Sequence, residues 1–193
     1  MKKILISLCL VSFVLTASAQ KFSAGLKGGV NISNFTGGNF DDLDKKALLG
    51  FHAGGFLSFG IGNIYLQPEL LVSTAGAKFG EDVNDESLKI TYLTLPIMVK
   101  YKMTSGFYLE VGPQVGFKLG EDVGDQTLDE FAKNLDLSLG AGLGYQFGGV
   151  GIGGRYLVGL SKVGDFEPSS GLDPDFKNSV IQIGVFFALG GNK

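Results

Sequence analysis

Five charged residues stand alone in stretches that are otherwise apolar or rich in glycine: Lys27, Glu69, Lys100, Glu110 and Arg155. If the fold brings them together, they could form an ion or proton path, or a gate made of breakable ion pairs. Alternatively, they could form a structural network that neutralises buried charge. Because an unpaired buried carboxylate is costly, the second interpretation is favoured.

His52 is the only histidine of the chain, so it is the natural candidate for a general base in a hydrolase or acyltransferase. Such a site needs a nucleophile, a base and an orienting acid within reach of one another. No serine is obviously paired with His52 in the sequence. We therefore predict no catalytic residues and no enzymatic activity.

Asp82, Asp85 and Glu86 have a carboxylate spacing that could bind a divalent cation. No acidic segment, however, matches the whole twelve-residue pattern of a calcium-binding EF-hand loop, with its fixed glycine and terminal glutamate. Residues 148–154 are dense in glycine but join two predicted strands, so they do not match a phosphate-binding loop, which precedes a helix. We predict no resident metal and no cofactor.

Residues 1–19 have the pattern of a secretory signal peptide. Lys2 and Lys3 precede the apolar stretch Ile4–Leu15, and small residues at 17–19 form the cleavage site. The only cysteine, Cys9, lies in this segment, so the remaining chain has no thiol for a disulfide or for catalysis. We predict that residues 20–193 form a single domain.

Eight stretches alternate apolar and polar residues with a period of two, which is typical of β-strands. The predicted strands are Phe22–Ser33, Gly50–Phe59, Ile64–Lys78, Lys89–Tyr101, Phe107–Lys118, Leu135–Phe147, Val150–Ser161 and Ser179–Leu189. The odd-numbered connections are long and the even-numbered ones are tight, at Gly60–Asn63, Lys102–Gly106 and Gly148–Gly149. This alternation is typical of an outer-membrane β-barrel with both mature termini on the periplasmic side.

The two faces of the predicted strands differ in charge. One face carries no charged side chain on any strand, as hydrocarbon requires, since a Lys or Arg at the midplane costs about 2–4 kcal/mol. The other face combines glycines with Lys27, Asn31, His52, Gln67, Glu69, Lys100, Glu110, Gln114, Lys118, Asp136, Arg155 and Gln182. A lipocalin-like barrel, with the apolar face inside, is the alternative. Its solvated face would carry fewer glycines.

Aromatic residues gather at the strand ends beside the tight turns, as in an interfacial girdle. They are Phe22, Phe59, Tyr65, Tyr101, Phe107, Tyr145, Phe147 and Phe187. The tight turns also predict the strand register: Phe147 opposite Val150, Arg155 opposite Gly142, Glu69 opposite Gly54, and Met98 opposite Glu110 with Lys100 on the diagonal. In this arrangement glycines leave room for long charged side chains that cross a narrow interior.

Acidic residues concentrate in the four long connections, which contain sixteen of the 19; the exceptions are Glu69, Glu110 and Asp136. Such an acidic rim repels nucleic acid. The predicted partners are instead outer-membrane lipid and lipopolysaccharide, whose phosphates divalent ions could bridge to the rim, together with other envelope proteins.

Several stretches resemble the outer-membrane β-barrel family that includes the PorT-like proteins of Gram-negative bacteria. The resemblance rests on residues 25–33 (GLKGGVNIS), 65–70 (YLQPEL), 92–97 (YLTLPI), 108–114 (YLEVGPQ) and 153–156 (GGRY). It implies a small barrel, often described as porin-like, with some members implicated in protein secretion. The chain departs from many such barrels in ending on Gly190–Lys193 rather than on a terminal aromatic residue.

Together these patterns predict an all-β fold, an eight-stranded antiparallel up-and-down transmembrane β-barrel. Side chains fill the interior of a barrel of this size, so an open channel is not expected. We predict a non-enzymatic envelope scaffold or interaction protein that acts through acidic surface loops, within a secretion-type assembly. The alternative is a low-conductance, porin-like passage for small solutes or ions.

Overall fold

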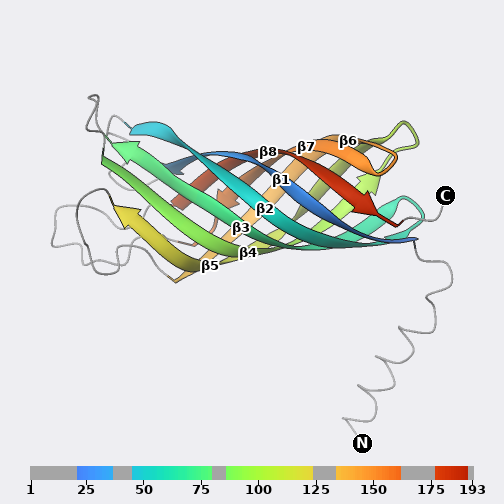
Figure 1. The fold of residues 1–193 in the computed structure, drawn as a ribbon, viewed down its shortest axis with the longest axis horizontal. Helices are drawn as coiled ribbons and strands as arrows, with labels where there is room; N and C mark the ends of the chain where they lie inside the picture. Colours follow the sequence, from blue (N-terminus) through green and yellow to red (C-terminus); the bar gives the residue numbers. More distant parts are fainter. Residues whose placement is uncertain (1–20, 37–44, 80–85, 124–133, 162–176, 191–193) are drawn as a thin grey trace, which may run out of the picture.

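The computed structural model is a closed barrel of eight antiparallel strands in which each strand pairs with its neighbours in sequence and β1 pairs with β8 (Figure 1). The structure describes residues 21–36, 45–79, 86–123, 134–161 and 177–190. The strands are β1 (Lys21–Thr36), β2 (Lys45–Ile61), β3 (Ile64–Phe79), β4 (Glu86–Lys102), β5 (Phe107–Val123), β6 (Leu135–Phe147), β7 (Val150–Gly159) and β8 (Lys177–Leu189). The predicted fold class is confirmed.

The two faces of the sheet are assigned as the alternation predicts. Apolar side chains point outward and remain exposed on every strand, as Leu26, Ile97 and Ile183 illustrate. The polar residues predicted for the opposite face are buried or half-buried in the interior. The barrel is therefore apolar outside and polar inside, the inverse of a water-soluble protein, and this suits a hydrocarbon surrounding.

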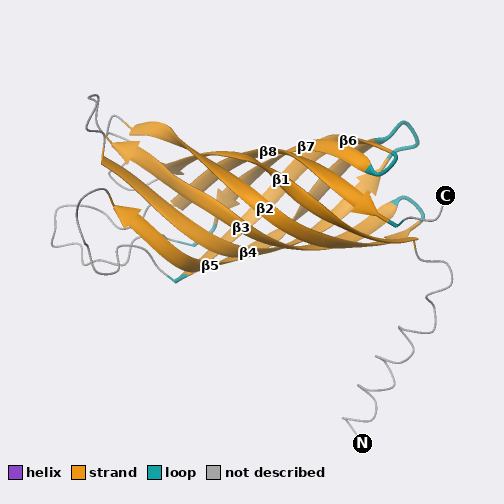
Figure 2. Cartoon of the chain, viewed as in Figure 1, coloured by secondary structure: helices purple, strands orange, loops and turns teal. Residues whose placement is uncertain are grey.

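The two ends of the barrel differ. The tight turns lie at one end, together with the first and last residues of the described chain (Figure 1). The remaining connections all leave from the opposite end (Figure 2). No helix in the described ranges is long and apolar enough to cross a membrane.

Several strands extend further than predicted at the end with the long connections, whereas β7 ends two residues earlier than predicted, at Gly159. β2 begins at Lys45, β4 at Glu86, and β5 continues to Val123. Glu86 and Asp122 therefore belong to strands, where we had predicted loops. Backbone pairing continues there, for example between Lys89 and Asp122, because ladder hydrogen bonds do not require apolar side chains.

The register is as predicted at the β6–β7 turn, with Phe147 opposite Val150 and Arg155 opposite Gly142. The other two predicted registers are wrong by two residues. Glu69 lies opposite Phe56 instead of Gly54, and Glu110 lies opposite Lys100 instead of Met98. A shift of two preserves the side-chain faces, which is why the face assignment survives.

Aromatic residues surround the end of the barrel that carries the tight turns. Phe22 and Phe59 form one outward-facing pair across neighbouring strands, and Phe107 and Tyr145 form another, with ring centroids 5.3 and 4.9 Å apart. Tyr65 was also predicted for this girdle, but its ring turns inward beneath Lys102, whose Nζ lies 4.1 Å from the ring centroid. The other seven predicted girdle residues are exposed on the outer face.

Candidate functional site

The centre of the barrel is crossed by the guanidinium of Arg155. This group donates hydrogen bonds to both carboxylate oxygens of Glu69, at 2.8 and 3.1 Å, and to Glu110 Oε1 at 2.7 Å. Arg155 lies on β7 and Glu69 on β3, which are separated by three strands in either direction around the closed sheet. The contact therefore joins opposite walls of the barrel across its interior.

Two lysines complete the network of five charges. Lys27 Nζ lies 3.4 Å from Glu69 Oε2, and Lys100 Nζ lies 3.2 Å from Glu110 Oε2. Gln67 donates a further hydrogen bond to Glu69 at 2.8 Å. The five residues that the sequence singled out thus come together, and each carboxylate is held by Arg155 and by one lysine.

An aromatic cluster packs against this network. Phe56, Tyr108 and Phe186 are buried inside the barrel, and the rings of Phe56 and Phe186 lie nearly perpendicular to each other, with centroids 5.9 Å apart. Lys100 Nζ lies 4.4 Å from the ring centroid of Tyr108 and 5.0 Å from that of Phe186, within the range of cation–π attraction. The aromatic cluster therefore lies directly beside the charge network in the interior of the barrel.

Glycines make room for these large inward side chains. Gly25, Gly144 and Gly151 lie directly opposite Phe56, Tyr108 and Phe186 on the neighbouring strands. Gly142 lies between Glu110 and Arg155, where an added Cβ would come within 3.0 Å of Glu110 Oε1. The predicted role of glycine is therefore observed, and it extends to aromatic residues that the sequence analysis did not place inside.

His52 lies in the interior, as predicted, but not in a catalytic arrangement. Its Nδ1 forms a 2.7 Å hydrogen bond with Asn31 Oδ1, and Asn31 donates to Ser73 Oγ at 2.9 Å. Because the histidine contacts an amide rather than a serine and an acid, the alternative of a general base gains no support. His52 Nε2 and Gln182 border a cavity of about 10 Å³, the size of a single water molecule.

The other predicted candidates take no part in this centre. Asp82 and Asp85 lie outside the described residues, and the side chain of Glu86 is not described. In the described part of the chain, no three or more His, Cys, Asp or Glu residues form a group that could hold a metal ion. Gly148 lies in the two-residue turn between β6 and β7, with a φ of 58°, as expected for a hairpin.

The family model of the outer membrane protein beta-barrel domain matches residues 18–165, well over half of the chain. The chain belongs to this family. It is thus an outer-membrane β-barrel protein, in agreement with its apolar outer face. No curated protein matches the chain.

Among solved structures, the chain is similar to the outer membrane protein OprG from Pseudomonas aeruginosa. The TM-score is 0.50 and the sequence identity is 12%, over 89% of this chain and 97% of OprG. The attachment invasion locus protein Ail of Yersinia pestis is similar with a TM-score of 0.48 and 16% identity, over 88% of this chain and 99% of Ail. At these identities the likeness to OprG concerns the fold alone.

Proposed function

We propose that the protein is a plugged, non-enzymatic barrel that serves the envelope as a scaffold or interaction protein. The observation that carries this proposal is the contact of Arg155 with Glu69 across the interior. Ion pairs and aromatic rings occupy the path that a solute would take, and the cavities beside them measure only about 20 and 10 Å³. A barrel without a passage acts through its ends.

We infer that the end with the long connections carries the interaction surface. Most acidic residues of the chain lie in or beside these connections, which supports contact with cationic partners or, through divalent ions, with lipopolysaccharide phosphates. Residues 1–19 would act as a signal peptide, and both mature termini would face the periplasm. The resemblance to PorT-like proteins supports a place in a secretion-type assembly.

Planar-bilayer conductance of the refolded mature chain tests the plug. Folding is first verified by the different gel mobility of boiled and unboiled samples. We expect a silent membrane. Discrete and reproducible single-channel steps would contradict the proposal and favour the porin-like alternative.

Cross-linking in cells tests the interaction surface. A photo-reactive residue is placed at Asp125, in the connection between β5 and β6, and as a control at Met103, in the tight turn between β4 and β5. We expect adducts with envelope components at position 125, and fewer of them when neighbouring acids are neutralised. Equal or absent labelling at position 125 relative to position 103 would contradict the assignment of this surface.

A further inference from the structure

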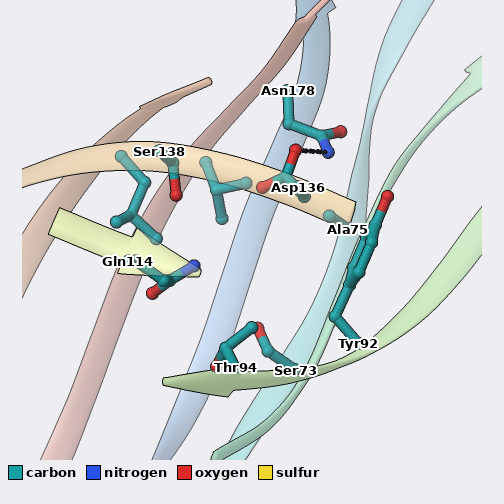
Figure 3. A pocket seen from close by; sticks show the side chains of 10 residues that line it. Ser73, Ala75, Tyr92, Thr94, Gln114, Asp136, Ser138 and Asn178 are labelled. Carbon is teal, nitrogen blue, oxygen red and sulfur yellow. Dashed lines mark hydrogen bonds between the residues drawn. The ribbon is translucent and has the colours of Figure 1, made fainter. Parts of the chain in front are cut away.

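A groove of about 440 Å³ lies on the outer wall of the barrel, where β1, β2, β3 and β4 run side by side (Figure 1). Gly55 faces outward there without a side chain, and the exposed residues Leu57, Leu70 and Leu95 also border the space. We call this hollow the Gly55 groove. It is far larger than the interior cavity beside Asp136, which measures about 20 Å³ and holds little more than one water (Figure 3).

Two prolines interrupt the hydrogen-bonded ladder at this groove. Proline has no backbone N–H to donate, and within sheets it is normally confined to edge strands, which a closed barrel does not have. The register sets Pro68 opposite Leu57 and Pro96 opposite Glu69, and the ladder is interrupted at both pairs. Opposite residues of a hydrogen-bonded pair exchange two bonds. The carbonyl oxygens of Leu57 and Glu69 are thus the acceptors that lose a donor in the ladder.

Glu69 borders the groove through its main chain. Its carboxylate points into the interior and binds Arg155, and its side chain has no exposed surface. The residue as a whole is nevertheless 3% exposed, so the exposed part is backbone. In hydrocarbon there is no water to supply the missing hydrogen bond, and a backbone acceptor that faces lipid needs another donor. The groove therefore combines an apolar surface with one acceptor that the sheet leaves open.

The groove lies a short distance below the membrane interface. Phe59, a residue of the aromatic girdle, is two residues from Leu57 along β2. At about 3.3 Å per residue and a strand tilt of about 45°, this step corresponds to about 5 Å of depth. A plain acyl chain has no hydrogen-bond donor, and the donors of a headgroup stay at the membrane surface. A hydroxyl group on an acyl chain, close to its ester bond, reaches this depth.

We propose that the Gly55 groove binds a membrane lipid whose acyl chain carries a hydroxyl group close to the headgroup. The chain covers Gly55 and packs between the leucines, and the hydroxyl donates a hydrogen bond to the carbonyl oxygen of Glu69. The inference rests on the hydrocarbon surrounding of the outer face and not on the plug, so a conducting barrel would leave it standing.

Native mass spectrometry of the refolded mature protein tests this site with two synthetic phosphatidylcholines. One lipid has β-hydroxytetradecanoyl chains and the other has tetradecanoyl chains. The choline headgroup has no hydrogen-bond donor, so the two lipids differ only in the chain hydroxyl. We expect the wild type to bind one molecule of the hydroxylated lipid about two- to tenfold more tightly than the plain one, which is the effect of one net hydrogen bond.

Gly55→Leu fills the groove and should lose the specific binding of both lipids. Gly28→Leu is the matched control on β1, because Gly28 also faces outward but does not border the groove. Both positions accept a side chain: an added Cβ would have Gly25 O at 3.4 Å and His52 O at 3.6 Å as its close neighbour, respectively. Gly28→Leu should therefore bind the hydroxylated lipid as the wild type does.

Pro96→Ala restores the N–H opposite Glu69 and leaves the groove open, since the Pro96 side chain is buried in the interior. This variant should bind the two lipids equally well. Pro113→Ala, which restores an N–H on β5 away from the groove, should keep the preference for the hydroxylated lipid. Equal binding of both lipids by the wild type, or an undiminished preference in Gly55→Leu or Pro96→Ala, would overturn the proposal. A dimer that Gly55→Leu abolishes would overturn it as well and assign the groove to a second copy of the chain.

Discussion

The guanidinium of Arg155 lies between the buried carboxylates of Glu69 and Glu110, which come from different walls of the barrel, and donates hydrogen bonds to both. Replacing Arg155 with alanine leaves Glu69 and Glu110 with one lysine each and removes three hydrogen bonds. We expect Arg155→Ala to lower the free energy of unfolding by about 3–5 kcal/mol, since breaking a buried ion pair exposes the full cost of the remaining charge. Urea unfolding of the barrel in lipid vesicles measures this loss.

Arg155→Lys is the matched control, because it keeps the charge but cannot bridge Glu69 in a bidentate manner. Its stability should lie between those of the wild type and Arg155→Ala. If Arg155→Ala resists urea as well as the wild type does, the carboxylates are not held by this pairing.

Gly142 tests the packing around the same network. A Cβ at this position would lie 2.6 Å from the backbone oxygen of Gly154 and 3.0 Å from Glu110 Oε1. We expect Gly142→Ala to destabilise the barrel by about 1–3 kcal/mol, as overpacking does. In Gly154→Ala, on the neighbouring strand, the Cβ would have Gln182 O at 3.9 Å as its one close neighbour. That variant should stay within about 0.5 kcal/mol of the wild type in the same urea assay.

At the scale of the strands, the faces could be predicted but two registers could not. An alternation with a period of two shows which face of the sheet each residue occupies, but not which residues of neighbouring strands pair. The sequence therefore identified which residues point inward but left the register open. The length of the β2–β3 turn was hidden, because Gly60 and Ile61 continue the ladder and only Gly62 and Asn63 turn, with Gly62 at a φ of 61°. In the same way, β4 continues to Lys102, which pairs with Tyr108 in β5. This extension shortens the turn and places Lys100 opposite Glu110.

Because the outer face is apolar, the energetic cost of a charged substitution on it should depend on the depth of the residue in the membrane. Two residues of a single strand can test this. Ile183 lies near the middle of β8 and Leu189 at its end, and both side chains are exposed on the outside. Ile183→Lys should lower the free energy of unfolding by about 2–4 kcal/mol and Leu189→Lys by about 0–1 kcal/mol. Urea unfolding in vesicles distinguishes them. Equal losses at the two positions would contradict a membrane that surrounds the centre of this strand.

For the molecule as a whole, the charge network was more predictable than the features around it. Lys27, Glu69, Lys100, Glu110 and Arg155 stand out because charges are rare on a face otherwise rich in glycine. The aromatic cluster was missed although Phe56 and Phe186 share a strand face with the inward-facing His52 and Gln182, because the predicted inner face was assembled from polar residues and glycines alone.

Closure of the sheet makes a final prediction about connectivity. Ala24 pairs with Leu189, so the ends of the described chain lie side by side at the end with the tight turns. A short glycine linker from residue 190 to residue 21 should therefore allow new termini in the connection between β5 and β6, since such permutations succeed at exposed connections. We expect this permutant to refold with nearly the wild-type urea midpoint. Opening the chain between Thr94 and Leu95, inside β4, should abolish the folded gel band. If both permutants fold equally well, an unbroken hydrogen-bonded β4 is not required to close the barrel.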